Sequence, residues 1–288
     1  MGFIGLFVLL LAPVGVYVWL RHKVVSHIPE NYPGRVLLQA NNAVVVCAGD
    51  SLTHGNISVN YVDRLANRFA GQPIQFLNAG RNADLTYSLL DRLDNVIAAK
   101  PDVVTILIGT NDVNASLNEQ ERSHYQKLGR IDAGIMPTFA TFQANYRQVV
   151  SRLKSAGIRR IALASLPVMS EDLTHEANHR AEAYSAFIRE LCQEERLMYL
   201  PVREAMTTYL AGFPAQRPHR YEAKQRLMTL NVARFQLLGQ SWDALTQHRG
   251  NQLTHDMLHL NTAGADFIAD AVATYLETNL LPQPILHS

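Results

Sequence analysis

The chain has 288 residues, of which 48% are hydrophobic and 18% charged, so it has ample material for a core and lacks the composition of a disordered protein. Its 26 Lys and Arg residues balance 25 Asp and Glu residues, which gives no electrostatic reason to expect a nucleic-acid partner. Cys47 and Cys192 fall in a predicted strand and a predicted helix, where we interpret them as small buried hydrophobes and not as a disulfide framework.

The first predicted element is an apolar helix at the N-terminus. Residues 2–20 carry no charge, and a helix of this length, at ~1.5 Å per residue, just crosses a hydrocarbon core of ~30 Å. Trp19 suits the aromatic belt at a membrane interface, and Arg21 and Lys23 follow it. We therefore expect residues 1–23 to be an uncleaved membrane anchor, and the two basic residues favour a cytoplasmic side for the rest of the chain.

Two other interpretations of this segment fit less well. A cleavable signal peptide would have a basic stretch before its apolar run and a small-residue cleavage site after it, and the sequence has neither. A buried core helix is a weak explanation for a terminal segment this apolar. Residues 24–42, which contain Pro29, Pro33 and Gly34, are expected to connect the anchor to a folded domain.

Beyond this connector, short apolar runs alternate with helical patterns. The predicted strands are residues 44–48, 74–77, 103–108, 160–164 and 197–200. Apolar residues at helical spacing predict helices over 61–69, 85–97, 137–156, 178–195 and 262–278, the last with Thr262 as its N-cap. Such alternation indicates βαβ units, a mostly parallel sheet and helices on both of its faces. The sequence thus predicts one α/β domain over residues 43–280.

Two long stretches interrupt the alternation. Residues 113–135 are polar and follow a strand end, and residues 212–254 contain Pro214, Pro218 and a helical part from Leu227 to Leu238. Insertions at the ligand-binding end of a sheet often form lids or substrate walls. Insertions that form surface loops with no role in binding explain these two stretches equally well.

The first predicted strand ends in Gly49-Asp50-Ser51-Leu52, which places a serine at the carboxyl end of a buried strand. Parallel sheets bind ligands at this edge, and Gly49 allows the chain to turn sharply there. We expect Asp50 to hold this turn by hydrogen bonding. On its own Ser51 would be interpreted as a helix-capping serine, but with a base to take its proton it becomes a candidate nucleophile.

Three further segments supply the groups that such a serine needs. One strand ends in Asn78-Ala79-Gly80, the next in Gly109-Thr110-Asn111-Asp112, and Asp256-Met257-Leu258-His259 precedes the last helix. His259 can act as the base, and Asp256, three residues earlier, can orient and stabilise its ring. The N–H groups of Ser51 and Gly80 and the side-chain amide of Asn111 are candidate donors to an oxyanion.

Together the four segments resemble, in order, the four blocks of the SGNH (GDSL) family of serine hydrolases. The resemblance runs from about residue 43 to residue 278. It implies a flavodoxin-like three-layer α/β/α domain with a Ser-His-Asp triad and with no metal or cofactor. It also implies a role for each matching residue: nucleophile and first oxyanion donor for Ser51, further donors for Gly80 and Asn111, base for His259 and orienting acid for Asp256.

Two other histidines compete with His259 for the role of the base. His54 lies near the serine in sequence but has no evident acid partner, and His255 is adjacent to Asp256, which places the two side chains poorly for pairing. The family often has proline after its histidine, where this chain has Leu260. That position shapes the turn and leaves the predicted triad intact. No pair of His or Cys residues at metal-binding spacing supports a metal site.

The sequence therefore predicts a membrane-anchored serine esterase or lipase for carboxylic esters, and the anchor favours a lipid or lysolipid acyl ester as its substrate. The main alternative within this reaction class is an esterase that removes acetyl groups from a cell-envelope polysaccharide. The alternative outside it is a catalytically inactive, membrane-tethered binding module. The complete set of candidate catalytic residues argues against that alternative.

Overall fold

The computed structural model of the chain describes residues 15, 18–19, 22–214 and 221–281. At its centre is a sheet of five strands: β1 (Ala43–Gly49), β2 (Ile74–Gly80), β3 (Val103–Leu107), β4 (Arg160–Ala164) and β5 (Met198–Leu200). All neighbouring strands are parallel, in the order β2-β1-β3-β4-β5, which is the order of flavodoxin-like doubly wound sheets. The predicted parallel α/β fold is thus confirmed, and each strand lies where its apolar run predicted it.

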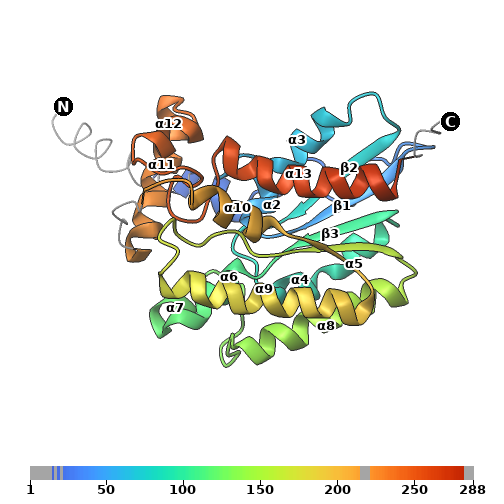
Figure 1. The fold of residues 1–288 in the computed structure, drawn as a ribbon, viewed down its shortest axis with the longest axis horizontal. Coiled ribbons are helices and arrows are strands. Elements are labelled where there is room, and N and C mark those ends of the chain that lie inside the picture. The colour runs from blue at the N-terminus through green and yellow to red at the C-terminus, as the bar shows by residue number, and fades with distance from the viewer. Residues whose placement is uncertain (1–14, 16–17, 20–21, 215–220, 282–288) are drawn as a thin grey trace, which may run out of the picture.

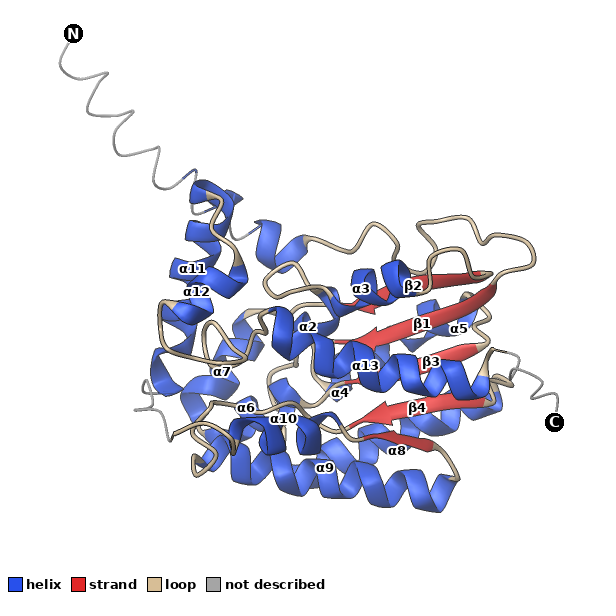
Figure 2. Ribbon diagram, turned by 45° about the horizontal axis from the view of Figure 1, so that its top comes forward, coloured by secondary structure: helices blue, strands red, loops and turns tan. Residues whose placement is uncertain are grey.

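Helices cover both faces of the sheet (Figures 1 and 2). On β1, Val44, Val46 and Ala48 face one layer and Val45 and Cys47 the other, because side chains alternate along a strand. The first layer consists of α4 (Thr86–Asp91), α5 (Leu93–Ala98), α8 (Phe139–Ser155) and α9 (Glu176–Glu195). The second consists of α3 (Tyr61–Arg68), α10 (Val202–Leu210) and α13 (Thr262–Asn279).

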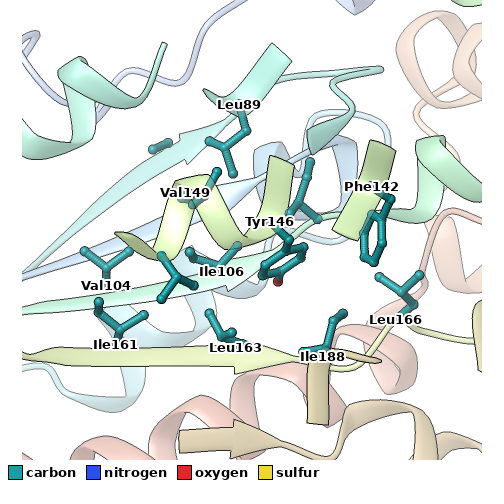
Figure 3. Packing of buried hydrophobic residues seen from close by; sticks show 14 of the residues in the cluster. Leu89, Val104, Ile106, Phe142, Tyr146, Val149, Ile161, Leu163, Leu166 and Ile188 are labelled. Atoms are coloured by element: carbon teal, nitrogen blue, oxygen red, sulfur yellow. The ribbon is translucent and has the colours of Figure 1, made fainter. Parts of the chain in front are cut away.

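The core of the first layer is packed from strands and helices far apart in the sequence (Figure 3). Ile106 of β3 and Leu163 of β4 belong to the same buried cluster as Tyr146 and Val149 of α8 and Ile188 of α9, and none of the five is exposed to solvent. Complete burial of one such aliphatic side chain stabilises a fold by roughly 1.5–3 kcal/mol. This packing gives the carboxyl ends of the strands a rigid base.

Two helix predictions differ from the structure in detail. The helical pattern over 85–97 forms two short helices, because the helix is interrupted at the buried residue Arg92. The Arg92 guanidinium donates to Asp84 Oδ2 at 2.6 Å and to Gly49 O at 3.0 Å. The prediction that Thr262 caps α13 was wrong. The N-cap is Asn261, whose side chain accepts from Gly264 N, and Thr262 instead bonds to Asp243.

The described parts of the two interrupting stretches are largely helical. The first contains the end of α6 (Thr110–Leu117) and all of α7 (Glu119–Lys127). The second contains the short helix η2 (Tyr221–Ala223), then α11 (Lys224–Leu238) and α12 (Trp242–Gln247). Figure 2 shows the strands pointing toward the end of the molecule where α7, α11 and α12 lie.

The predicted anchor over residues 2–20 lies outside the described residues, except for Gly15, Val18 and Trp19. None of the helices in the described part of the chain is both long enough and apolar enough to cross a membrane. From residue 22 the chain is described again: the π-helix η1 (His22–Ser26) leads into the connector, and its Val24 packs against the cluster formed by α11 and α12.

Candidate active site

Ser51 is the first residue of α2 (Ser51–His54), the short helix that follows β1. Asp50 caps this helix, since its Oδ1 accepts the N–H of Leu52 at 3.0 Å, as expected for the residue that holds the turn. Gly49 has no room for a side chain, because a Cβ would lie 2.2 Å from Thr53 Oγ1 and 2.3 Å from Leu107 O. The end of β1 therefore closes tightly on β3, and Ser51 is presented at the carboxyl edge of the sheet.

His259 and Asp256 lie in the loop before α13 and face Ser51. Ser51 Oγ is 3.0 Å from His259 Nε2, and His259 Nδ1 is 2.7 Å from Asp256 Oδ2. A carboxylate only accepts hydrogen bonds, so Nδ1 carries the proton and Nε2 is free to accept the serine proton. The other carboxylate oxygen, Asp256 Oδ1, accepts the N–H groups of Leu258 and His259 at 3.1 and 2.8 Å, which fixes the acid in place.

The charges of this pair reinforce one another. Burial alone would raise the pKa of the Asp256 carboxyl, but the neighbouring His259 and His255 rings and the hydrogen bonds from His259 outweigh it and hold the pKa well below its usual range. Burial alone would lower the pKa of His259, but the Asp256 carboxylate outweighs it and raises the pKa above the ordinary value. Asp256 is thus an anion beside a ring that binds a proton readily.

Neither of the two rival histidine rings has Ser51 among its hydrogen-bond partners in the described residues. His54 Nδ1 lies 2.9 Å from Asn82 Oδ1 and its Nε2 lies 3.0 Å from His27 Nδ1, while burial lowers the pKa of this ring to about 4. His255 Nδ1 receives a hydrogen from the Asn231 amide, so its Nε2–H donates to Ile57 O at 2.9 Å, and burial lowers the pKa of this ring too. Both rings support the loops around the site.

Asn111 lies at the start of α6, just past β3, and is almost completely buried. Its Nδ2 donates to Asp84 O at 2.9 Å, and its Oδ1 accepts from the Tyr125 hydroxyl at 2.8 Å. Because a carbonyl can only accept, these two partners fix which way the amide points. One Nδ2–H is used by Asp84, and the second is available to a ligand in the site.

Gly80 does not occupy the position expected of an oxyanion donor. Its N–H donates to Asn78 Oδ1 at 2.9 Å, so this group is already engaged. A Cβ at Gly80 would lie 2.1 Å from His54 N and 2.6 Å from Thr53 C. The glycine therefore allows β2 to pack against the backbone of α2, and its contribution to the site is this close approach.

Ala83, three residues after Gly80, lies at the site in the position that was expected of Gly80. It lines the same cavity as Ser51 and Asn111, and no hydrogen bond found among the described residues uses its N–H. Its φ of 62° is left-handed, which a residue other than glycine adopts only when its surroundings hold it there. This position could not be predicted from the residue type, because alanine has no preference for that conformation.

Replacing Gly80 with alanine is expected to destabilise the fold by about 1–3 kcal/mol, because the new methyl group overlaps the backbone of α2. Thermal unfolding would measure the loss. The matched control is Gly212→Ala, whose Cβ meets only Tyr209 O, at 3.3 Å. Equal unfolding temperatures for the two variants would contradict the packing role of Gly80.

The candidate residues open into a small cavity of about 110 Å³. This volume is well below the roughly 300–1,000 Å³ of pockets that hold drug-sized ligands. The wall is mainly apolar, and part of it comes from outside the catalytic segments: from Val24 and Val25 in the N-terminal segment, from Leu128 after α7, and from Met228 of α11. Both interrupting stretches thus contribute to the wall of the cavity.

The N-terminal part of this wall is held by hydrogen bonds to its backbone. The Asn82 amide donates to Val24 O, and Arg130 Nη2 donates to Val25 O at 3.3 Å. Arg130 also donates to Asn82 O at 3.1 Å, and its guanidinium lies near the buried carboxylate of Asp84. The segment before the domain is therefore tied to the loop that carries Ala83.

Three side chains of the loop before α13 come close enough together to resemble a metal-binding group: His255, Asp256 and His259. Their ligand atoms already have other partners. His259 Nε2 faces Ser51 Oγ, and both nitrogens of His255 are used by Asn231 and Ile57. The arrangement fits a proton relay better than a coordination site.

Comparison with known proteins agrees with this geometry. The model of the GDSL-like lipase/acylhydrolase family matches residues 47–267. Among curated proteins, none matches the chain.

Solved structures with a similar fold include an acetylxylan esterase from Geobacillus stearothermophilus, at 17% identity and a TM-score of 0.58, covering 83% of this chain and 96% of that one. A lipase/acylhydrolase from Enterococcus faecalis has 22% identity and a TM-score of 0.56, covering 84% of this chain and 98% of that one. At these identities the likeness shows a shared fold.

Proposed function

Because the chain belongs to the GDSL-like lipase/acylhydrolase family, whose members are carboxylic ester hydrolases, we propose that it removes a short acyl group from an alcohol with Ser51, His259 and Asp256 as its catalytic triad. Support for the triad is the unbroken chain of hydrogen bonds from Ser51 Oγ through His259 to Asp256, at 3.0 and 2.7 Å. Support for the short acyl group is the cavity of about 110 Å³ beside that serine.

In the first half of the reaction, Ser51 Oγ attacks the ester carbonyl carbon while His259 Nε2 takes the hydroxyl proton. The carbonyl oxygen becomes an oxyanion. Three donors face it in our proposal: the Ser51 N–H, which as the first amide of α2 has no partner within that helix, the Ala83 N–H and the second Nδ2–H of Asn111. The Asp256 carboxylate stabilises the imidazolium form of His259 that results.

In the second half, the tetrahedral intermediate collapses and the C–O bond to the alcohol breaks. His259 gives its proton to the departing alkoxide oxygen, which leaves an acyl group on Ser51. Water then attacks that acyl group with His259 again as the base, and the acid product and free Ser51 are released. Each proton that His259 accepts is returned, so the site is regenerated without a cofactor.

A series of p-nitrophenyl esters from acetate to dodecanoate tests the size of the acyl group. We expect kcat/KM to be highest for the shortest esters and to fall as the chain outgrows the cavity. Met228→Ala, which removes part of the wall, should move the optimum to longer chains, whereas Met198→Ala, on the exposed side of β5, should leave it unchanged.

A rate that rises steadily with chain length would contradict the short-acyl proposal and favour a lipid or lysolipid substrate. One observation supports that second candidate: Val24 and Val25, just after the predicted anchor, form part of the cavity wall. An acyl chain from a lipid surface would then approach the serine along this segment. A strict preference for acetate would instead favour acetylated carbohydrates as the substrate class. The similar acetylxylan esterase acts, by its name, on a substrate of this class.

A further inference from the structure

The loop between β4 and α9 contacts the loop of Asp256 and His259 through two consecutive residues. The Ser170 N–H donates to Met257 O at 2.8 Å. The Glu171 carboxylate accepts three successive backbone N–H groups, at 2.7, 2.8 and 2.8 Å, and one hydroxyl at 3.1 Å; these donors belong to Gln252, Leu253 and Thr254. The next residue along the chain from these donors is His255, followed by Asp256.

The contact of Glu171 is specific to a carboxylate. Both of its oxygens accept hydrogen bonds, and all four donors come from residues 252–254. No ion pair between Glu171 and a Lys or Arg side chain is found in the described ranges. Hydrogen bonds from backbone N–H groups to an ionised acceptor are shorter and stronger than neutral ones. The negative charge is thus used to hold backbone.

The backbone held in this way is paired with the backbone of the catalytic histidine. Asn261 N donates to Leu253 O at 2.9 Å, and His255 N donates to His259 O at 3.0 Å. An antiparallel bridge joins Thr254 to Leu260. The position of residues 252–254 therefore sets the position of His259 from the opposite side of the same loop.

The hydrogen bond from Ser170 N to Met257 O holds a strained part of the turn between Asp256 and His259. Met257 lies between the acid and the base of the site with a φ of 85°, and its partner Ser170 has a φ of 93°. Residues other than glycine rarely adopt this region, so surrounding contacts must stabilise both. The hydrogen bond between Ser170 and Met257 joins the two strained residues directly.

The β4–α9 loop is itself firmly anchored. The side chain of Asn178 in α9 accepts from Met169 N at 2.9 Å and donates to Ser170 O at 2.9 Å and to Asp172 O at 2.8 Å. Buried Arg203 donates to Asn178 O at 2.8 Å. Glu171 thus extends from a rigid support.

We propose that Glu171 is a positioning residue for ester hydrolysis: its carboxylate holds residues 252–254 so that Asp256 and His259 keep the geometry needed to activate Ser51. This role rests on the proposed function. Glu171 lies on the β4–α9 loop and touches neither the serine nor the cavity, so it acts through the backbone of the triad loop.

Glu171→Gln tests this role with almost no change in size. An amide keeps one acceptor oxygen and turns an NH₂ group toward N–H donors, so part of the contact becomes repulsive. We expect kcat to fall about 100-fold, the scale associated with a catalytic group displaced by about 1 Å, with little change in KM.

The variant should also change the pH profile. In the wild-type protein the Asp256 carboxylate raises the pKa of His259, and the base works only when deprotonated, so kcat/KM falls as the pH drops through this raised pKa. A looser contact between the acid and the base lets the pKa of His259 return toward its ordinary value. The acid limb of the profile therefore moves to lower pH in Glu171→Gln.

The matched control is Asp172→Asn, in the adjacent residue of the same loop. Asp172 Oδ1 accepts from Thr174 N and Thr174 Oγ1 at 3.0 and 2.6 Å, and its side chain makes no hydrogen bond to residues 252–261 in the described structure. The substitution Asp172→Asn removes the same charge as Glu171→Gln and should leave both kcat and the acid limb of the pH profile unchanged. Glu171→Asp, one methylene shorter, should retain part of the activity.

Several outcomes separate this proposal from the proposed function. If Glu171→Gln matches Asp172→Asn in rate and pH profile while the wild-type protein hydrolyses esters, the positioning role is overturned. A lower rate at an unchanged acid limb, in step with a lower unfolding temperature, would also overturn it. If the wild-type protein hydrolyses no ester, an NMR titration of the His259 ring in the full chain still decides, because the role requires its pKa to fall in Glu171→Gln and not in Asp172→Asn.

Discussion

Replacing Ser51 with alanine is expected to abolish ester hydrolysis, with kcat falling on the order of 10⁶-fold, the scale seen when the nucleophile of a serine hydrolase is removed. The substitution deletes one buried oxygen and leaves the cap at Asp50, the cavity and the His259–Asp256 pair in place. The fold should persist while no acyl-enzyme can form. Initial rates with p-nitrophenyl acetate, together with unfolding temperatures, measure both effects.

A matched control is Ser116→Ala, because the Ser116 hydroxyl donates to Val113 O at 2.7 Å within α6 and lies outside the triad. A fluorophosphonate probe should label the wild-type protein and Ser116→Ala but not Ser51→Ala. If Ser51→Ala retained the wild-type rate, another residue would be the nucleophile. If the folded wild-type protein resisted labelling and hydrolysed no ester, the inactive binding module would be the better interpretation.

Asp256→Asn is expected to lower kcat by about 10⁴-fold without unfolding the protein. The reason lies in how the carboxylate is held. Asp256 Oδ1 accepts two backbone N–H groups, from Leu258 and His259, so in the variant this position stays an oxygen. The NH₂ group then replaces Oδ2 and points at His259 Nδ1, which must become an acceptor. The proton moves to Nε2, where it blocks the transfer from Ser51.

The same variant should show a second effect in its pH profile. Burial lowers the pKa of His259, and Asp256 is the main group that raises it. Without this carboxylate the pKa shifts downward, because the smaller influence of Asp50 alone does not match that of burial. The acid limb of the remaining kcat/KM therefore moves to lower pH. Asp243→Asn is the control, because Asp243 bonds to the first residue of α13 and not to the triad. An unchanged acid limb in Asp256→Asn would mean that another group sets the pKa of His259.

Much of the fold could be predicted because the central strands are continuous apolar runs. Such runs are buried on both faces, and the alternation of strands with helices determines a parallel sheet. The helical pattern over 85–97 was less informative, because its apolar spacing continues through Arg92. The break there depends on Asp84 and on the end of β1, which are tertiary partners of that side chain.

The residues of the candidate site likewise include some that the local sequence could predict and some that it could not. Ser51, Asn111, Asp256 and His259 each follow a strand or precede a helix, so local sequence was enough to place them at one edge of the sheet. Gly80 was expected to donate to the oxyanion because glycine suggests close approach to a ligand. It does approach closely, but to the backbone of α2, while the left-handed turn that faces the cavity belongs to Ala83.

Glu171 could not have been found from the sequence. It is a single glutamate in a loop, and its partners Gln252 to Thr254 are some eighty residues away along the chain. The same holds for the cavity wall, where Val24 and Met228 are ordinary apolar residues until the fold brings them together. Contacts of this kind carry no local pattern, and only the assembled structure reveals them.

The position of the acid–base pair near the end of the chain has a consequence for biosynthesis. Ser51 and all five strands are complete by residue 200, whereas Asp256 and His259 arrive only with the loop before the final helix. Any product of premature termination before residue 256 lacks both groups, even if its sheet assembles. On the proposed function such fragments would hydrolyse no ester, because Ser51 would have neither its base nor its orienting acid.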